Sequence, residues 1–133
     1  MAHLHFNHWA ILAVAAFQWL LGAAWFSPVL FLNPWKKALG ITGKSKNALA
    51  GMVASLVASL LLSFVLAHMI LWSGAADFGH GAFIGFIAWL GFYAAPYYAL
   101  SLFEEAPFKL VAINTGYWLV GIVLSGGVLA VWR

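Results

Sequence analysis

The chain has 133 residues, of which 65% are hydrophobic and 7% are charged, with a formal net charge of +3. A soluble domain carries about a quarter of its residues as charged side chains, so this chain could not cover a water-facing surface and its excess apolar residues must face lipid. The small net charge without a Lys/Arg-rich face argues against nucleic-acid binding, and the absence of Cys excludes disulfides and thiolate metal sites.

We expect a single integral membrane domain over residues 1–133, because four apolar stretches are long enough to cross a bilayer. They cover about residues 9–26, 48–72, 81–103 and 110–132. Each is roughly 18 to 25 residues long, which at about 1.5 Å per residue spans a hydrocarbon core of about 30 Å. The stretches are continuous rather than alternating, which predicts an all-α bundle of four transmembrane helices. No basic segment precedes Trp9, so we expect the first stretch to be a retained helix rather than a signal peptide.

The short loops orient the predicted helices. Lys36, Lys37, Lys44 and Lys46 lie between the first and second stretches, whereas Arg133 is the basic residue at the opposite end. Basic residues in short loops favour the cytoplasmic side, and acidic residues contribute little to orientation. The sequence therefore predicts a cytoplasmic lysine loop and both termini on the outer face.

With this topology all the histidines belong to the outer side of the membrane. They are His3, His5, His8, His68 and His80. Neutral imidazoles are common metal ligands, so His3, His5, His8 and His80, together with Asp77, form a candidate site for Cu or Zn. The alternative is that they are solvated groups at the interface.

His68 is a separate case because it lies inside the second stretch. Its neighbours at helical spacing include Phe64 and Trp72. An axial ligand to a haem or chlorin is one interpretation of a histidine flanked by aromatic side chains. The other is a single histidine that forms a hydrogen bond near the headgroups.

Small residues recur at every fourth position of the second stretch. The row consists of Gly51, Ser55, Ser59, Ser63 and Ala67. Small residues at this spacing let two helix backbones approach closely. Gly81 and Gly85 begin the third stretch with the same spacing. Both rows predict tight packing, either within the chain, or against a second copy or a subunit of a larger membrane complex.

Pro96 and several polar side chains interrupt the apolar stretches. Pro96 is expected to kink the third helix and to free the carbonyl of Phe92. The polar side chains at similar depth, which we expect to face the bundle interior, are Gln18, Tyr93, Tyr97, Asn114 and Tyr117. They fit either a small polar cavity or interhelical hydrogen bonds. No carboxylate or lysine lies near the centre of a stretch, which argues against a proton-driven transporter.

Two motifs lie where the first stretch ends and where the last stretch begins. The first is Trp25-Phe26-Ser27-Pro28, followed by Phe31, Trp35 and Gly40. The second comprises Phe103, Phe108-Lys109-Leu110, Ile113-Asn114 and Gly116-Tyr117-Trp118. Together they resemble the signature of a small bacterial integral-membrane family, domain of unknown function 1761. The resemblance covers nearly the whole chain and implies a four-helix protein of the bacterial inner membrane, without an assigned activity, cofactor or catalytic residue.

The sequence contains no recognisable catalytic constellation. No Ser-His-acid set or phosphate-binding glycine loop can be placed, and Glu104 and Glu105 fit a structural role at the start of the last helix. We therefore expect a non-catalytic scaffold or accessory subunit that works through helix contacts. The alternatives are a metal- or cofactor-binding protein of the outer face and a carrier of small solutes.

Overall fold

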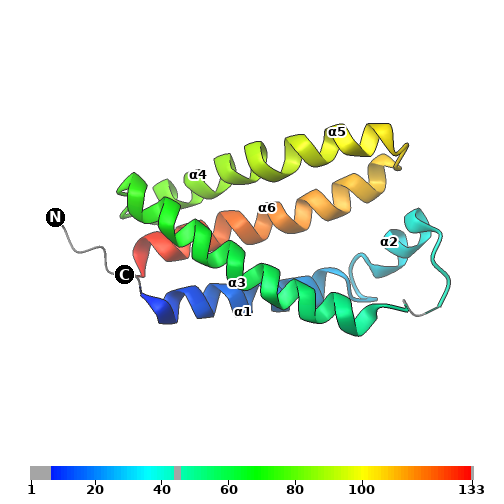
Figure 1. The fold of residues 1–133 in the computed structure, drawn as a ribbon, viewed down its shortest axis with the longest axis horizontal. Helices are drawn as coiled ribbons and strands as arrows, with labels where there is room; N and C mark the ends of the chain where they lie inside the picture. The colour runs from blue at the N-terminus through cyan, green and yellow to red at the C-terminus, as the bar shows by residue number, and fades with distance from the viewer. Residues whose placement is uncertain (1–6, 44–45, 133) are drawn as a thin grey trace.

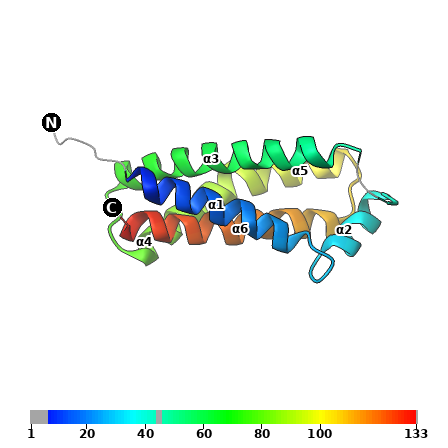
Figure 2. The same ribbon diagram turned by 90° about the horizontal axis from the view of Figure 1, so that it is seen from below.

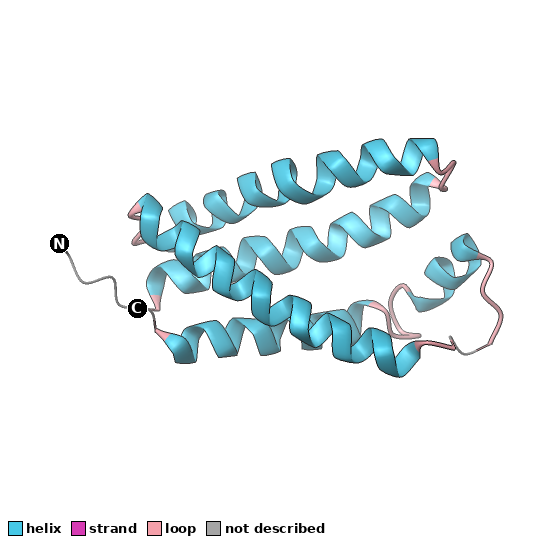
Figure 3. Cartoon of the chain, viewed as in Figure 1, coloured by secondary structure: helices cyan, strands magenta, loops and turns pink. Residues whose placement is uncertain are grey.

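The computed structural model describes residues 7–43 and 46–132, and within these ranges all regular structure is helical (Figure 3). The elements are α1 (His8–Trp25), α2 (Leu32–Leu39), α3 (Ala48–Ser73), α4 (Phe78–Trp89), the π-helix η1 (Leu90–Ala94), α5 (Ala95–Phe103) and α6 (Phe108–Val131). Four helical segments are long and apolar enough to cross a membrane: His8–Trp25, Ala48–Ser73, Phe78–Phe103 and Phe108–Val131. The all-α prediction with four candidate spans is confirmed.

Capping residues explain where two of these helices begin. The side chain of Asn7 accepts hydrogen bonds from the backbone N–H groups of Trp9 and Ala10, at 3.1 and 3.2 Å. The carboxylate of Asp77 accepts one from the N–H of His80 at 2.8 Å. Because Asp77 caps α4, the third span begins at Phe78, earlier than the start predicted from hydropathy.

The short helix α2 was not expected from the sequence. It is only eight residues long, which is too short to cross a membrane. Pro34 lies in its first turn, where a proline is tolerated, and Gly40 ends it in the left-handed conformation with φ of 72°. The helix packs against α6.

The third span contains a π-helix just before its proline. Over Leu90–Ala94 the backbone hydrogen bonds join residues five positions apart instead of four. The N–H of Ala95, for example, donates to the carbonyl of Leu90. Pro96 then begins α5 within its first turn. The segment α4–η1–α5 therefore continues as one helical rod (Figure 1), with the local irregularity taken up by η1 rather than by a break.

α6 is the common packing partner of the other helices. It contacts α1, α2, α3, α4 and α5, and it is the most buried of the spans. Figures 1 and 2 show that the start of α1, the α3–α4 turn and the end of α6 lie at one end of the bundle, with α2 and the α5–α6 turn at the other. α3 meets α4 at the first end and diverges from α5 toward the second.

The apolar core lies between α1, α3 and α6. Its buried side chains are Ala10, Ile11, Val14, Leu66, Ala67, Ile70, Ala75, Ile122, Leu129 and Ala130. These residues are concentrated in the half of the bundle that holds the α3–α4 turn. In the opposite half, Leu110, Val111 and Ile113 at the start of α6 are buried beside aromatic side chains.

Candidate functional site

The two sequence motifs meet in an aromatic cluster at the end of the bundle that holds α2. The ring of Trp25 lies 4.8 Å from that of Phe31 and 6.4 Å from that of Tyr117, measured between centroids. Phe26 contacts both Trp35 and Tyr117, at 5.3 and 5.6 Å. The two motifs therefore face each other between α1, α2 and α6, and the cluster joins these three elements.

Close backbone contacts complete this cluster. The indole N–H of Trp25 donates to the carbonyl of Ile113 at 3.0 Å. A Cβ at Gly116 would lie 3.2 Å from the Trp25 ring, and one at Gly22 would lie 2.8 Å from the Tyr117 hydroxyl. The glycines leave room for the aromatic rings, which gives the cluster a structural role.

Polar side chains are buried where α1, α3 and α6 meet. Gln18 is fully buried, and its side-chain amide lies against Gly121. Tyr117 donates from its hydroxyl to the backbone carbonyl of Gln18 at 2.7 Å. The amide of Gln18 and the hydroxyls of Ser63 and Ser125 have no hydrogen-bond partner among the described residues.

Two further polar residues of the predicted interior lie between α5 and α6. The side-chain amide of Asn114 donates to the hydroxyl of Tyr97 at 2.9 Å. The Tyr97 ring stacks on that of Tyr93, with centroids 5.5 Å apart and planes 7° apart. The Asn114–Tyr97 hydrogen bond is an interhelical contact, whereas the Tyr93–Tyr97 stack lies within the third span.

The predicted row of small residues on α3 is buried at one end and exposed at the other. Ser59, Ser63 and Ala67 are buried inside the bundle, whereas Gly51 is exposed, with nothing within 4 Å of a Cβ built on it. Ser55 is partly buried, and its hydroxyl donates to the carbonyl of Met52. The inner part of the α3 row therefore packs within the chain, and its Gly51 end does not.

Gly81 and Gly85 form a very close contact between α4 and α6. A Cβ on Gly81 would overlap the backbone of Gly126, and one on Gly85 would overlap the backbone of Ile122. α4 and α6 therefore touch backbone to backbone, as the spacing of small residues favours.

The described histidines share one end of the bundle without forming a cluster. His8 begins α1, His68 lies near the end of α3, and His80 is in the first turn of α4, where Asp77 serves as the helix cap. No group of three or more His, Asp or Glu residues in the part of the chain that the structure describes could hold a metal ion. His3 and His5 lie outside the described residues, so the metal site stays a prediction.

His68 lies between two aromatic rings of its own helix. Its Nδ1 is 2.8 Å from the carbonyl of Phe64, so this nitrogen carries the proton. Its ring centroid lies 4.4 Å from that of Phe64 and 5.5 Å from that of Trp72. His68 is therefore hydrogen-bonded to the backbone of its own helix and packed against two aromatic rings. Its role as a haem or chlorin ligand stays a prediction.

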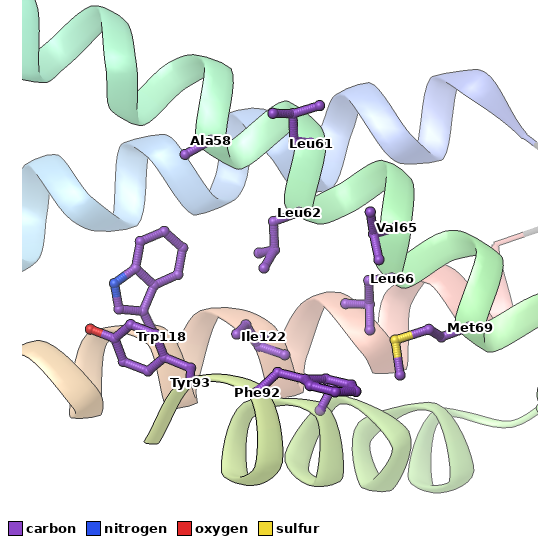
Figure 4. A pocket seen from close by; sticks show the side chains of 11 residues that line it. Ala58, Leu61, Leu62, Val65, Leu66, Met69, Phe92, Tyr93, Trp118 and Ile122 are labelled. Carbon is purple, nitrogen blue, oxygen red and sulfur yellow. The ribbon is translucent and has the colours of Figure 1, made fainter. Parts of the chain in front are cut away.

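A groove lies between α3 and α4–η1, with α6 as its floor (Figure 4). Its volume is about 500 Å³, within the usual range of small-molecule sites, and it opens on one side of the bundle. The residues that line it are Ala58, Leu61, Leu62, Val65, Leu66, Met69, Ala88, Phe92, Tyr93, Trp118 and Ile122. The lining is almost entirely carbon.

Two polar atoms lie at one end of the groove. The rings of Tyr93 and Trp118 lie 5.7 Å apart, and Figure 4 shows the hydroxyl and the indole nitrogen at the same end. Two other tryptophans of the spans do have partners. Trp19 of α1 donates its indole N–H to the carbonyl of Met52, and Trp89 of α4 donates its own to the carbonyl of Thr115. Neither the Tyr93 hydroxyl nor the Trp118 N–H has a hydrogen-bond partner within residues 7–43 and 46–132.

The sequence did not single out this groove. Tyr93 was predicted to face the interior, but Phe92 and Trp118 carried no signal that separated them from lipid-facing aromatic residues. The groove depends on how far α3 diverges from α4–α5, which is a property of the packed bundle.

Four long apolar helical segments, the first three of which pack against the fourth, define a multi-pass α-helical membrane protein. The comparison with protein families agrees with this class. The chain belongs to the family described as "Protein of unknown function (DUF1761)", whose model matches residues 9–130. It matches none of the curated proteins and none of the solved structures with which it was compared.

Proposed function

We propose that the protein resides in the bacterial inner membrane and acts without catalysis, as an accessory subunit that binds other transmembrane helices. The partner is a second copy of this chain or another subunit of a membrane complex. The observation that carries the proposal is a row of small residues on the outside of the third span.

This row consists of Gly91, Ala95 and Ala99, on the side of η1 and α5 that faces away from Tyr97 and Ser101. All three row residues are exposed, and nothing lies within 4 Å of a Cβ built on Gly91. Small residues leave a shallow seam that a second helix backbone can approach closely, whereas lipid chains gain little from it.

The same chain uses rows of this kind for its internal contacts. Gly81 and Gly85 touch the backbone of α6, and Ser59 and Ser63 are buried inside the bundle. The third span has the smallest buried fraction of all the candidate spans, because only its α4 half packs closely on α6. The η1–α5 half, with its small-residue row, is thus available to another helix.

Leucine substitutions in the row test the proposal. We expect Ala95→Leu and Ala99→Leu to reduce the assembled fraction severalfold, because the larger side chains hold the partner backbone away. Size-exclusion chromatography with light scattering in a mild detergent, together with cross-linking in native membranes, measures that fraction. The control is Ala16→Leu on α1, which is exposed and lies outside the row.

Thermal unfolding of each variant must stay at the wild-type temperature, so that a change in assembly is not a change in fold. A wild-type chain that is monomeric in native membranes contradicts the proposal. So does an assembly that both row variants leave intact.

A further inference from the structure

We propose that the groove between α3 and α4–η1 binds a neutral, ring-bearing lipophile of the quinone class. The carbonyl oxygen of the ring would accept hydrogen bonds from Tyr93 and Trp118, and the aliphatic tail would lie along the apolar lining. This inference concerns a different face from the small-residue row and does not depend on the proposed accessory role.

The depth of the two donors restricts what the ligand can be. Tyr93 and Trp118 lie near the middle of the spans Phe78–Phe103 and Phe108–Val131. In a hydrocarbon core about 30 Å thick this places both donors roughly 15 Å from either interface. The ester and phosphate groups of phospholipids stay near the interface, so a phospholipid offers only its acyl chain at this depth. The acceptor must belong to an uncharged molecule that enters the core.

The missing partners of the two donors point to an oxygen acceptor. A polar group in the hydrocarbon region that lacks a hydrogen bond costs free energy, and most such groups find a partner. Trp19 and Trp89 satisfy theirs with carbonyl oxygens of the chain. Two neighbouring donors at the end of one cavity match a carbonyl oxygen, which accepts two hydrogen bonds.

The remaining lining fits a flat ring and a tail. Phe92, Tyr93 and Trp118 place aromatic side chains around the end that holds the donors, where a planar ring can stack or meet them edge to face. Beyond them the groove continues past Leu62, Leu66 and Met69 without a charged group. The π-helix contributes both Phe92 and Tyr93, and such segments are frequent at functional sites.

Equilibrium binding to the full chain in lipid nanodiscs tests the inference. The probe is a radiolabelled benzoquinone with a decyl tail, and the matched compound is decylbenzene, which has the ring and tail but no carbonyl. We expect saturable binding of one quinone per chain, with decylbenzene competing at least fivefold more weakly. Empty nanodiscs measure simple partition into lipid.

Substitutions then locate the site. Tyr93→Phe removes one hydroxyl and should weaken quinone binding about threefold to tenfold, the range of one hydrogen bond. Trp118→Phe should have an effect of the same order, and Leu66→Trp should abolish binding by filling the groove. Tyr98→Phe is the control, because Tyr98 is exposed outside the groove.

The Tyr93 variant keeps the test decisive if Trp118→Phe or Leu66→Trp fails to fold, because it changes one atom at a partly exposed position. Binding that does not saturate above partition overturns the inference. Equal competition by decylbenzene also overturns it, as does a Tyr93→Phe variant that folds and binds with wild-type affinity, since either result leaves only an acyl-chain crevice.

Discussion

The hydroxyl of Tyr117 donates a 2.7 Å hydrogen bond to the backbone carbonyl of Gln18, which joins the last span to the first. The two residues are 99 positions apart in the chain, and both are buried. Tyr117 also contacts Trp25 and Phe26, so one side chain belongs both to the aromatic cluster and to the buried polar region.

The first prediction removes this hydrogen bond. Tyr117→Phe should lower the free energy of unfolding by about 1 kcal/mol, because interhelical hydrogen bonds in membranes contribute roughly 0.5 to 1.5 kcal/mol. Titration with a denaturing detergent, followed by circular dichroism, measures the change. Tyr98→Phe removes an exposed hydroxyl and should have no effect. Equal stability of the two variants would show that the bond contributes nothing.

The second prediction concerns the contact between Gly121 and Gln18. A methyl group at Gly121 would overlap the Gln18 side chain, so Gly121→Ala should destabilise the fold by about 1 to 3 kcal/mol. The double variant Gly121→Ala with Gln18→Ala should recover part of that loss, because the smaller side chain removes the overlap. Gly51→Ala, with open space around it, is the control and should be neutral or slightly stabilising. Absence of recovery in the double variant would contradict the contact.

The third prediction tests the buried part of the α3 row. Ser59 is 1% exposed, so Ser59→Leu should force α3 away from its neighbours and cost about 1 to 3 kcal/mol. Leu61, at 61% exposure, points away from the core, and Leu61→Phe should be mild. Thermal unfolding of both variants gives the comparison. If Ser59→Leu were as stable as the wild type, the row would not be a packing contact.

The fourth prediction concerns orientation. Lys36, Lys37 and Lys46 lie with Lys44 in the segment between α1 and α3, and we expect this segment in the cytoplasm. A reporter that is active only outside the cytoplasm should therefore work when it is fused after Arg133. A fusion at that position that is active only in the cytoplasm would reverse the topology, and with it the placement of the histidines on the outer side.

The four spans could be predicted because they depend on composition alone. A continuous apolar stretch of sufficient length has few alternatives to a transmembrane helix. Ser59, Gln18 and Gly81 were predicted to be contact residues for a related reason, since small or polar side chains fit poorly against lipid.

The groove could not be predicted, because it depends on partners from distant parts of the chain. Trp89 and Trp118 look alike in the sequence, yet only Trp89 reaches a carbonyl oxygen, that of Thr115 on α6. Likewise, no local pattern shows that the irregularity before Pro96 is taken up by a π-helix that turns Phe92 and Tyr93 toward α3. The small-residue rows show where helices can approach, but not which helix does so.

The position of α6 in the chain has a consequence for biosynthesis. Every other span packs against α6, and α6 follows all of them in the order of synthesis. During translation the first three spans therefore enter the bilayer before their common partner exists, with Gly81, Gly85 and Gln18 still facing lipid or the insertion machinery. The close packing of the third span is consequently a late event, because a chain interrupted before Phe108 would keep the contact between α1 and α3 but would lack the α6 surface against which α4 packs.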